Sequence, residues 1–264
     1  MRWKALILLV LLGAAGWSYG KREWDGRTRF TVVSVGQEVE VWSFDPQTRD
    51  GVRVKLPGNL EVETVGGRGR IKSQNLELAA QKFGGKSWAA DSVADYLGIG
   101  YIGEIGSLSF WDRWRWWWIG RGINWTLLSM GEGGWTQKVV AVDGEVLLRL
   151  SDSWVNERGK WFLDSAVASE GVSVTLVNTT QINGLGAHAA IALETAGMRV
   201  REIRNEIKSL KKCRLMGRKE SKKTFSVFWI VKNYTCQWES DDSLNTDELI
   251  VELGGDYQKW WLGE

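Results

Sequence analysis

Histidine and cysteine, two residue types that often bind metals or act in catalysis, are scarce in this chain. The 264 residues include one histidine, His188, and two cysteines, Cys213 and Cys236. One histidine excludes a multi-histidine metal site, and two cysteines exclude a four-cysteine zinc site. His188 falls in an alanine-rich helical pattern whose only acid is Glu194, six positions away. We therefore interpret His188 as a helix-surface residue and predict no catalytic residue, no metal site and no cofactor.

Two polar loops are the candidates for ligand binding. The run GGRGR at 66–70 could hold an anion with backbone N–H groups and two arginines, although a flexible turn is the alternative. The run NTTQINGLG at 178–186 precedes a predicted helix, whose N-terminal donors could receive an anion or a sugar. A capping turn with Asn183 as the N-cap is the alternative there. The candidate ligand-binding residues are Asn178, Thr179, Thr180, Asn183, Gly184, Gly186, Arg68 and Arg70.

The N-terminus has the pattern of an export signal. Arg2 and Lys4 precede an uncharged, apolar run over 5–17. We predict a single-pass signal anchor over residues 1–20, with the N-terminus in the cytoplasm and the cytoplasmic membrane as its partner; a cleaved signal peptide is the alternative. Either prediction places residues from about 24 onward outside the cytoplasm. In that compartment Cys213 and Cys236 are candidates for a disulfide, worth about 3 kcal/mol by loop entropy. In a cytosolic protein they would be two buried thiols.

The rest of the chain predicts an α/β fold class with two units, over 24–164 and 170–260. A strand at 30–35, a β-hairpin over 37–56 and a second hairpin over 138–150 alternate polar and apolar residues. Helical spacing predicts helices over 73–83 and 87–97. In the second unit, a strand at 172–177, a helix at 184–196 and a strand at 198–203 predict a βαβ unit. A helix over 221–234 and short strands at 235–238 and 248–253 complete it, and the small polar run 165–171 is the predicted boundary.

The segment 107–118 contains five tryptophans. At helical spacing, one face carries Phe110, Trp111, Trp114, Trp117 and Trp118, while Asp112, Arg113 and Arg115 point elsewhere. This pattern favours either an amphipathic helix at a membrane interface or a core helix filled with aromatic side chains. A platform for carbohydrate is a third interpretation.

Charge is unevenly distributed in the last third of the chain. Residues 201–223 contain ten Lys or Arg and three Asp or Glu, whereas 239–264 contain eight acids and one lysine. The two stretches could neutralise each other, or the basic stretch could bind anionic wall polymer or lipid head groups through Lys211, Lys212, Lys222 and Lys223. The total net charge of +2 gives no argument for nucleic acid as a partner.

Two regions resemble known families. Residues 172–257 are similar to a LytR C-terminal domain. The similarity is carried by the runs VTLVNTTQINGLGAHAAIALETAGMRV and ELIVELGGDY. Residues 30–106 resemble the first half of a LytR-CpsA-Psr domain. The segments that carry this resemblance are FTVVSV, VWSFDP, VRVKLPGNLEV and the helical run that begins at Arg70. That family transfers undecaprenyl-pyrophosphate-linked glycopolymers to peptidoglycan. The first strand of that family usually opens with the motif R-T-D, and the corresponding residues here are Arg27-Thr28-Arg29. The family's motif I-P-R-D-T corresponds to LPGNL at 56–60 in this chain. This chain is therefore similar to the family but lacks the arginine and carboxylates that pyrophosphate and Mg²⁺ require.

These observations predict a membrane-anchored, extracytoplasmic envelope protein. Its predicted role is that of a non-catalytic module that binds cell-wall polymer, such as peptidoglycan or an anionic wall polymer, or an envelope partner. The alternative is a divergent glycopolymer transferase that acts on a lipid-linked pyrophosphate through Arg68, Arg70, Asp112 and Arg113. A regulatory or assembly role ranks third, because only about four residues precede the apolar run.

Overall fold

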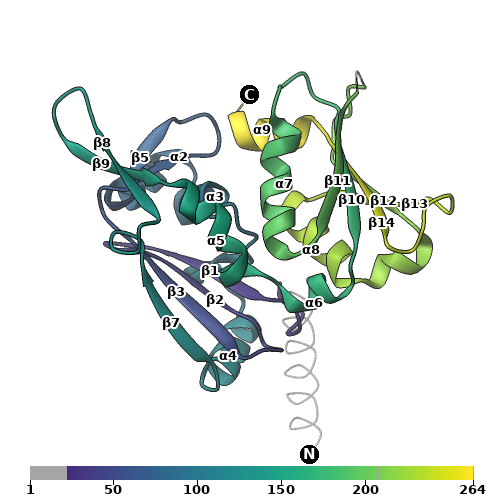
Figure 1. Ribbon diagram of the computed structural model, residues 1–264, viewed down its shortest axis with the longest axis horizontal. Helices are drawn as coiled ribbons and strands as arrows, with labels where there is room; N and C mark the ends of the chain where they lie inside the picture. Colours follow the sequence, from purple (N-terminus) through teal and green to yellow (C-terminus); the bar gives the residue numbers. More distant parts are fainter. Residues whose placement is uncertain (1–22, 207, 264) are drawn as a thin grey trace, which may run out of the picture.

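The computed structural model describes residues 23–206 and 208–263. They form a mixed α/β fold with two five-stranded sheets (Figure 1). The predicted α/β class is therefore confirmed. The predicted anchor over 1–20 lies outside the described residues. Within the described residues, every helix is too short or too polar to cross a membrane.

The first sheet has the strand order β6-β1-β2-β3-β7. Its strands are β1 (Phe30–Val35), β2 (Val39–Phe44), β3 (Asp50–Leu56), β6 (Gly103–Glu104) and β7 (Asn124–Ser129). β2 and β3 pair antiparallel with Val41 opposite Val54, which confirms the hairpin predicted over 37–56. Alternation of the side chains gives this sheet two apolar faces, with Val33 on one face and Val32 on the other.

Helices cover both faces of the first sheet. α2 (Leu76–Phe83) and α3 (Gly85–Leu97) pack on the face that carries Val33, and α5 (Asp152–Phe162) closes the same core. α4 (Phe110–Gly120) packs on the opposite face. Two small hairpins lie at the edge, β4 (Glu61–Glu63) with β5 (Arg70–Lys72) and β8 (Thr136–Val140) with β9 (Val146–Leu150). Short 3-10 turns, Ser73–Asn75 and Ile105–Ser107, precede α2 and α4.

The second sheet has the strand order β11-β10-β14-β12-β13. Its strands are β10 (Ser173–Asn178), β11 (Arg199–Asn205), β12 (Arg214–Gly217), β13 (Gln237–Ser240) and β14 (Glu248–Leu253). β10 runs parallel to both β11 and β14. α7 (Leu185–Ala196) connects β10 to β11, so the predicted βαβ unit is confirmed. α6 (Ser165–Ser169) connects the two sheets in the chain, and the domain limits drawn from the sequence remain predictions.

Helices and a disulfide complete the core of the second sheet. α7, α8 (Phe225–Tyr234) and α9 (Gly255–Leu262) contribute side chains to one apolar cluster. The helix predicted over 221–234 is divided, because a 3-10 turn at Lys219–Lys223 ends before Thr224, whose hydroxyl accepts from Val227 N–H and caps α8. Cys213 and Cys236 are joined and buried in this cluster, which confirms the predicted disulfide.

A buried carboxylate joins the two parts of the chain. Asp164 is 1% exposed and accepts hydrogen bonds from the backbone N–H of Arg29 at 2.9 Å and of Ala166 at 3.1 Å. Arg29, which occupies the acidic position of the family pattern, donates from its guanidinium to Leu163 O and Ser43 Oγ. Arg29 is thus part of a structural junction between β1 and the residues that lead into α6.

Candidate functional site

The predicted loop after β10 lines a crevice at one edge of the second sheet. β10, β11 and β14 are parallel, so their carboxyl ends at Asn178, Asn205 and Leu253 lie together. Beside them is a crevice of about 460 Å³, lined among others by Asn178, Thr180, Asn183, Asn205, Lys208 and Gln258. We call this hollow the crevice. Ligands of open α/β sheets characteristically bind outside the carboxyl ends of the strands.

The floor of the crevice is fixed by hydrogen bonds within the protein. The Asn178 amide donates to Ile182 O at 2.8 Å and to Asn205 Oδ1 at 3.1 Å. Its Oδ1 accepts from the N–H and the hydroxyl of Thr180. Thr179 donates from its hydroxyl to Leu253 O at 2.7 Å. Asn178, Thr179 and Thr180 therefore shape the loop, and their side chains already have partners.

The rim of the crevice carries amide side chains without partners among the described residues. Gln181, Asn183 and Gln258 line the crevice, and their side chains form no hydrogen bond to the rest of the described chain. Each amide offers two donors and one acceptor, which complements a hydroxyl that both donates and accepts. The sequence analysis did not select Gln181, although it lies inside the predicted loop 178–186. Gln258 could not be found from the sequence, since it lies 80 positions from Asn178 and only the sheet brings the two together.

The two glycines of the loop have structural roles. Gly184 has φ +85° and precedes α7 without a side-chain cap, so the alternative interpretation of Asn183 as N-cap is wrong. A Cβ on Gly186 would lie 2.7 Å from Ile203 Cγ2, so glycine there allows α7 to approach β11 closely. Neither glycine lines the crevice.

Arg68 and Arg70 lie elsewhere, on the hairpin of β4 and β5. Arg68 stacks over the Phe83 ring at 5.3 Å, and Arg70 pairs with Glu63 at 3.4 Å. The N–H groups of Gly66 and Gly67, expected to hold an anion, instead donate to Trp261 O at 2.8 and 3.3 Å. The glycine-rich loop therefore binds the end of α9.

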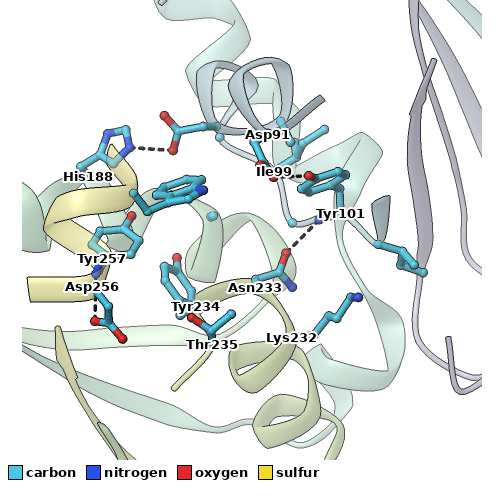
Figure 2. A pocket seen from close by; sticks show the side chains of 17 residues that line it. Asp91, Ile99, Tyr101, His188, Lys232, Asn233, Tyr234, Thr235, Asp256 and Tyr257 are labelled. Atoms are coloured by element: carbon cyan, nitrogen blue, oxygen red, sulfur yellow. Dashed lines mark hydrogen bonds and ion pairs between the residues drawn. The ribbon is translucent and has the colours of Figure 1, made fainter. Parts of the chain in front are cut away.

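The histidine lies in a second hollow, between the helices of the two sheets (Figure 2). We call it the cleft; it measures about 340 Å³ and is lined by Asp91, Asp95, Tyr101, His188, Lys232 and Asn233 among others. His188 Nε2 lies 2.8 Å from Asp95 Oδ1 on α3. Its interpretation as a simple helix-surface residue is thus wrong, because the acid that pairs with it comes from another helix, 93 positions away.

Several other ionisable groups of the cleft are also paired. Asp91 accepts a hydrogen bond from the Tyr101 hydroxyl; burial raises the pKa of Asp91, while hydrogen bonds from Tyr101 and Trp260 oppose that rise. Burial also raises the pKa of Tyr101. Lys232 Nζ lies 2.6 Å from Glu23 Oε2, and Asn233 accepts from Tyr101 N–H at 2.9 Å. The pairs of His188 with Asp95, Lys232 with Glu23 and Asn233 with Tyr101 connect the first part of the chain to α7 and α8, so the cleft is arranged as a joint.

The four residues of the alternative transferase prediction are not brought together. Arg68 and Arg70 lie on the small hairpin at one end of the first sheet, whereas Asp112 and Arg113 lie on α4, at its other end (Figure 1). Asp112 is fully buried and accepts from the N–H groups of Glu23 and Trp24. Among the described residues, no group of three or more His, Cys, Asp or Glu side chains could hold a metal ion.

Comparisons with known proteins give local and weak similarities. Neither a family model nor a curated protein matches the chain. TagU from B. subtilis is 19% identical with a TM-score of 0.24 over 28% of this chain, which spans about a third (32%) of TagU. Lin1025 from Listeria innocua is 16% identical with a TM-score of 0.23, and the alignment covers 28% of this chain and 31% of the Lin1025 chain.

One further solved structure aligns over a longer part of the chain. It is the LytR-CPS2A-psr family protein YwtF (TagT) with bound octaprenyl pyrophosphate lipid, 10% identical with a TM-score of 0.25 over 73% of this chain and 82% of that one. Similarities at these TM-scores establish neither a common overall fold nor a common activity. Membership of this chain in the family therefore stays a prediction.

Proposed function

We propose that this protein is a non-catalytic, extracytoplasmic envelope protein that binds a hydroxyl-rich wall polymer in the crevice. In this proposal residues 1–20 anchor it in the cytoplasmic membrane. The resemblance of residues 172–257 to a LytR C-terminal domain supports a place in the envelope. The peptidoglycan layer and the anionic polymers attached to it are the candidate ligands.

The disulfide supports the extracytoplasmic location. Cys213 and Cys236 are 0% and 4% exposed and form one bond between the starts of β12 and β13. Structural disulfides form and persist in oxidising compartments and are rare in the cytosol. This agrees with the export pattern at the N-terminus.

The observation that carries the proposal is the amide rim of the crevice. Gln181, Asn183 and Gln258 converge on one hollow, while Asn178 and Thr179 hold its floor rigid. A rigid floor loses little conformational entropy when a ligand binds. Neutral amides form hydrogen bonds with sugar hydroxyls and do not require a charged ligand. The geometry therefore favours a carbohydrate chain over an isolated ion.

Paired ionisable groups favour binding over catalysis. His188 Nε2 is bonded to Asp95, and among the described residues no serine, threonine or cysteine side chain bonds to His188, so the pair has no nucleophile within the protein to activate. The divergent transferase remains the alternative, but the arginines it requires lie on separate elements and face different neighbours.

The basic stretch supports an anionic component of the ligand. Lys211, Lys212, Lys222 and Lys223 are exposed and form no ion pair with other described residues. The predicted neutralisation holds for other members of the two stretches, since Arg201 pairs with Glu248 and Arg214 with Glu239 and Glu252. Substituting the four lysines by glutamine should weaken salt-sensitive retention on wall sacculi, and unchanged retention would refute an anionic ligand.

A sedimentation assay with the full chain in mild detergent tests the crevice. We expect the variant Gln181→Ala, Asn183→Ala, Gln258→Ala to bind purified sacculi at least about tenfold more weakly, because each lost hydrogen bond is worth about 1 kcal/mol. The matched control substitutes the exposed amides Gln47, Gln137 and Asn156, which lie outside the crevice, by alanine. Equal binding by both variants would contradict the proposed site.

A further inference from the structure

The aromatic face of α4 points outward. Phe110, Trp114, Trp117 and Trp118 are 62%, 48%, 52% and 63% exposed. The opposite side of the helix holds it to the protein, with Trp116 stacked on Phe30 and Asp112 buried. Four of the five residues predicted to share an aromatic face are thus exposed together, whereas Trp111 is half-buried with a buried Nε1. The alternative of core filling holds only for the opposite side of the helix, where Trp116 packs against the core.

These side chains form one continuous apolar surface with cations at its edge. Trp118 contacts Trp114 and Trp117, with ring centroids 6.3 and 6.4 Å apart. Arg121 stacks over the Trp117 ring at 3.6 Å, and Arg113 lines the same shallow hollow as Phe110. We call Phe110, Arg113, Trp114, Trp117, Trp118 and Arg121 the α4 surface. Monomeric soluble proteins rarely expose aromatic side chains in such a cluster, so this surface calls for a partner.

The chemistry of the α4 surface matches a lipid head-group region. Indole rings combine a large apolar area with one polar N–H and concentrate at membrane interfaces. Guanidinium groups bind phosphate oxygens. An amphipathic helix with aromatic residues on one side and basic residues beside them is the usual form of an interfacial membrane helix.

The path of the chain places this surface near the predicted membrane anchor. The backbone N–H of Glu23 donates to Asp112 Oδ2 at 2.9 Å, in the first turn of α4. The N–H of Trp24 donates to Asp112 Oδ1 at 3.3 Å. Only the five residues 18–22 separate Glu23 from the end of the apolar run. The six steps from Trp17 to Glu23 span at most about 22 Å, so an inserted run would hold Glu23, which is bonded to the start of α4, within that distance of the bilayer.

We propose that the α4 surface docks on the outer face of the cytoplasmic membrane and inserts its tryptophans among phospholipid head groups. This inference rests on the anchoring in the proposed function. Docking would fix the orientation of the first sheet with respect to the bilayer, and would add a second attachment beside the anchor.

The test uses one fluorophore on the full chain. Cys213 and Cys236 are the only cysteines and are bonded to each other, so Trp118→Cys introduces the only free thiol. This thiol is labelled with nitrobenzoxadiazole, and the protein is reconstituted into phosphatidylethanolamine–phosphatidylglycerol vesicles. The control is Val142→Cys, at the fully exposed turn between β8 and β9.

We expect nitroxide-bearing lipid to quench the fluorescence of the label at 118, whereas aqueous iodide leaves most of it. For the label at 142 we expect iodide to quench the fluorescence and the nitroxide lipid to leave most of it. Quenching by iodide alone at both positions would overturn the proposal, and so would shielding of 118 from both quenchers, which would indicate contact with a second copy of the chain. Flotation of the vesicles tests the anchor separately. Protein that does not float refutes both anchoring and docking, whereas floating protein with iodide-quenched label at 118 refutes docking alone.

Discussion

Asp164 is expected to make the stability of this protein depend on pH. Its carboxylate is almost completely buried between β1 and α6, and burial raises its pKa to about 6. Backbone N–H donors and the guanidinium of Arg29 oppose that rise without cancelling it. The ordinary pKa of an aspartate is 3.8, and the difference from the raised pKa is equivalent to about 3 kcal/mol.

The raised pKa determines the direction of the effect. Between pH 4 and pH 6 the folded chain holds a proton on Asp164 that the unfolded chain has released. The free energy of unfolding therefore contains a contribution from this group that is fully present below about pH 4 and is lost as the pH rises through about 6.

The variant Asp164→Asn isolates this contribution, since asparagine keeps an oxygen for the N–H groups of Ala166 and Val167 but does not titrate. Urea unfolding followed by tryptophan fluorescence gives the free energy of unfolding of both proteins from pH 4 to pH 8. We expect the wild type to lose about 3 kcal/mol relative to the variant across this range. A difference that stays constant with pH would refute the explanation by burial.

Three further predictions concern other parts of the structure. Replacing Cys213 and Cys236 by alanine should lower the free energy of unfolding by about 3 kcal/mol, because the bond closes a loop with a sequence separation of 23; a loss below about 1 kcal/mol in urea titrations would contradict this. Asp112→Ala should cost about 2 kcal/mol, because it leaves the buried N–H of Trp24 and the partly buried N–H of Glu23 without their acceptor, and it should speed trypsin cleavage near Glu23; unchanged cleavage would contradict the tethering. Gly67→Ala should detach the end of α9, because a Cβ there would lie 2.2 Å from a backbone oxygen of that helix; amide exchange in α9 should accelerate, and unchanged exchange would refute the contact.

Local sequence patterns predicted the elements that have strong periodicity. The alternation in β2 and β3 and the strand–helix–strand order around α7 follow from residues that are close in sequence. α9 was missed, because no element was predicted after the strand at 248–253. Glycine is needed at position 254 because there is no room for a side chain, since a Cβ there would lie 2.5 Å from the backbone of Lys212.

Contacts between distant segments were outside the reach of such patterns. Nothing in the sequence near His188 indicates that Asp95 pairs with it, or that Gly66 binds the end of α9. Periodicity identified the aromatic face of α4 but not its direction, because apolar spacing is the same whether a helix faces the core or a membrane. Asn178, Thr179, Thr180 and Asn183 were predicted as site residues and line the crevice, whereas the predicted Gly184 and Gly186 do not, and Gln181 and Gln258 are added by the structure.

Amide hydrogen exchange of the full chain, with and without soluble fragments of peptidoglycan that carry wall polymer, tests the proposed site most directly. The proposed function predicts slower exchange in residues 178–183 and 255–258, the two segments that meet in the crevice. The same fragments should leave the exchange of the Gln181→Ala, Asn183→Ala, Gln258→Ala variant unchanged. Protection confined to the cleft around His188, or no protection at all, would contradict binding in the crevice.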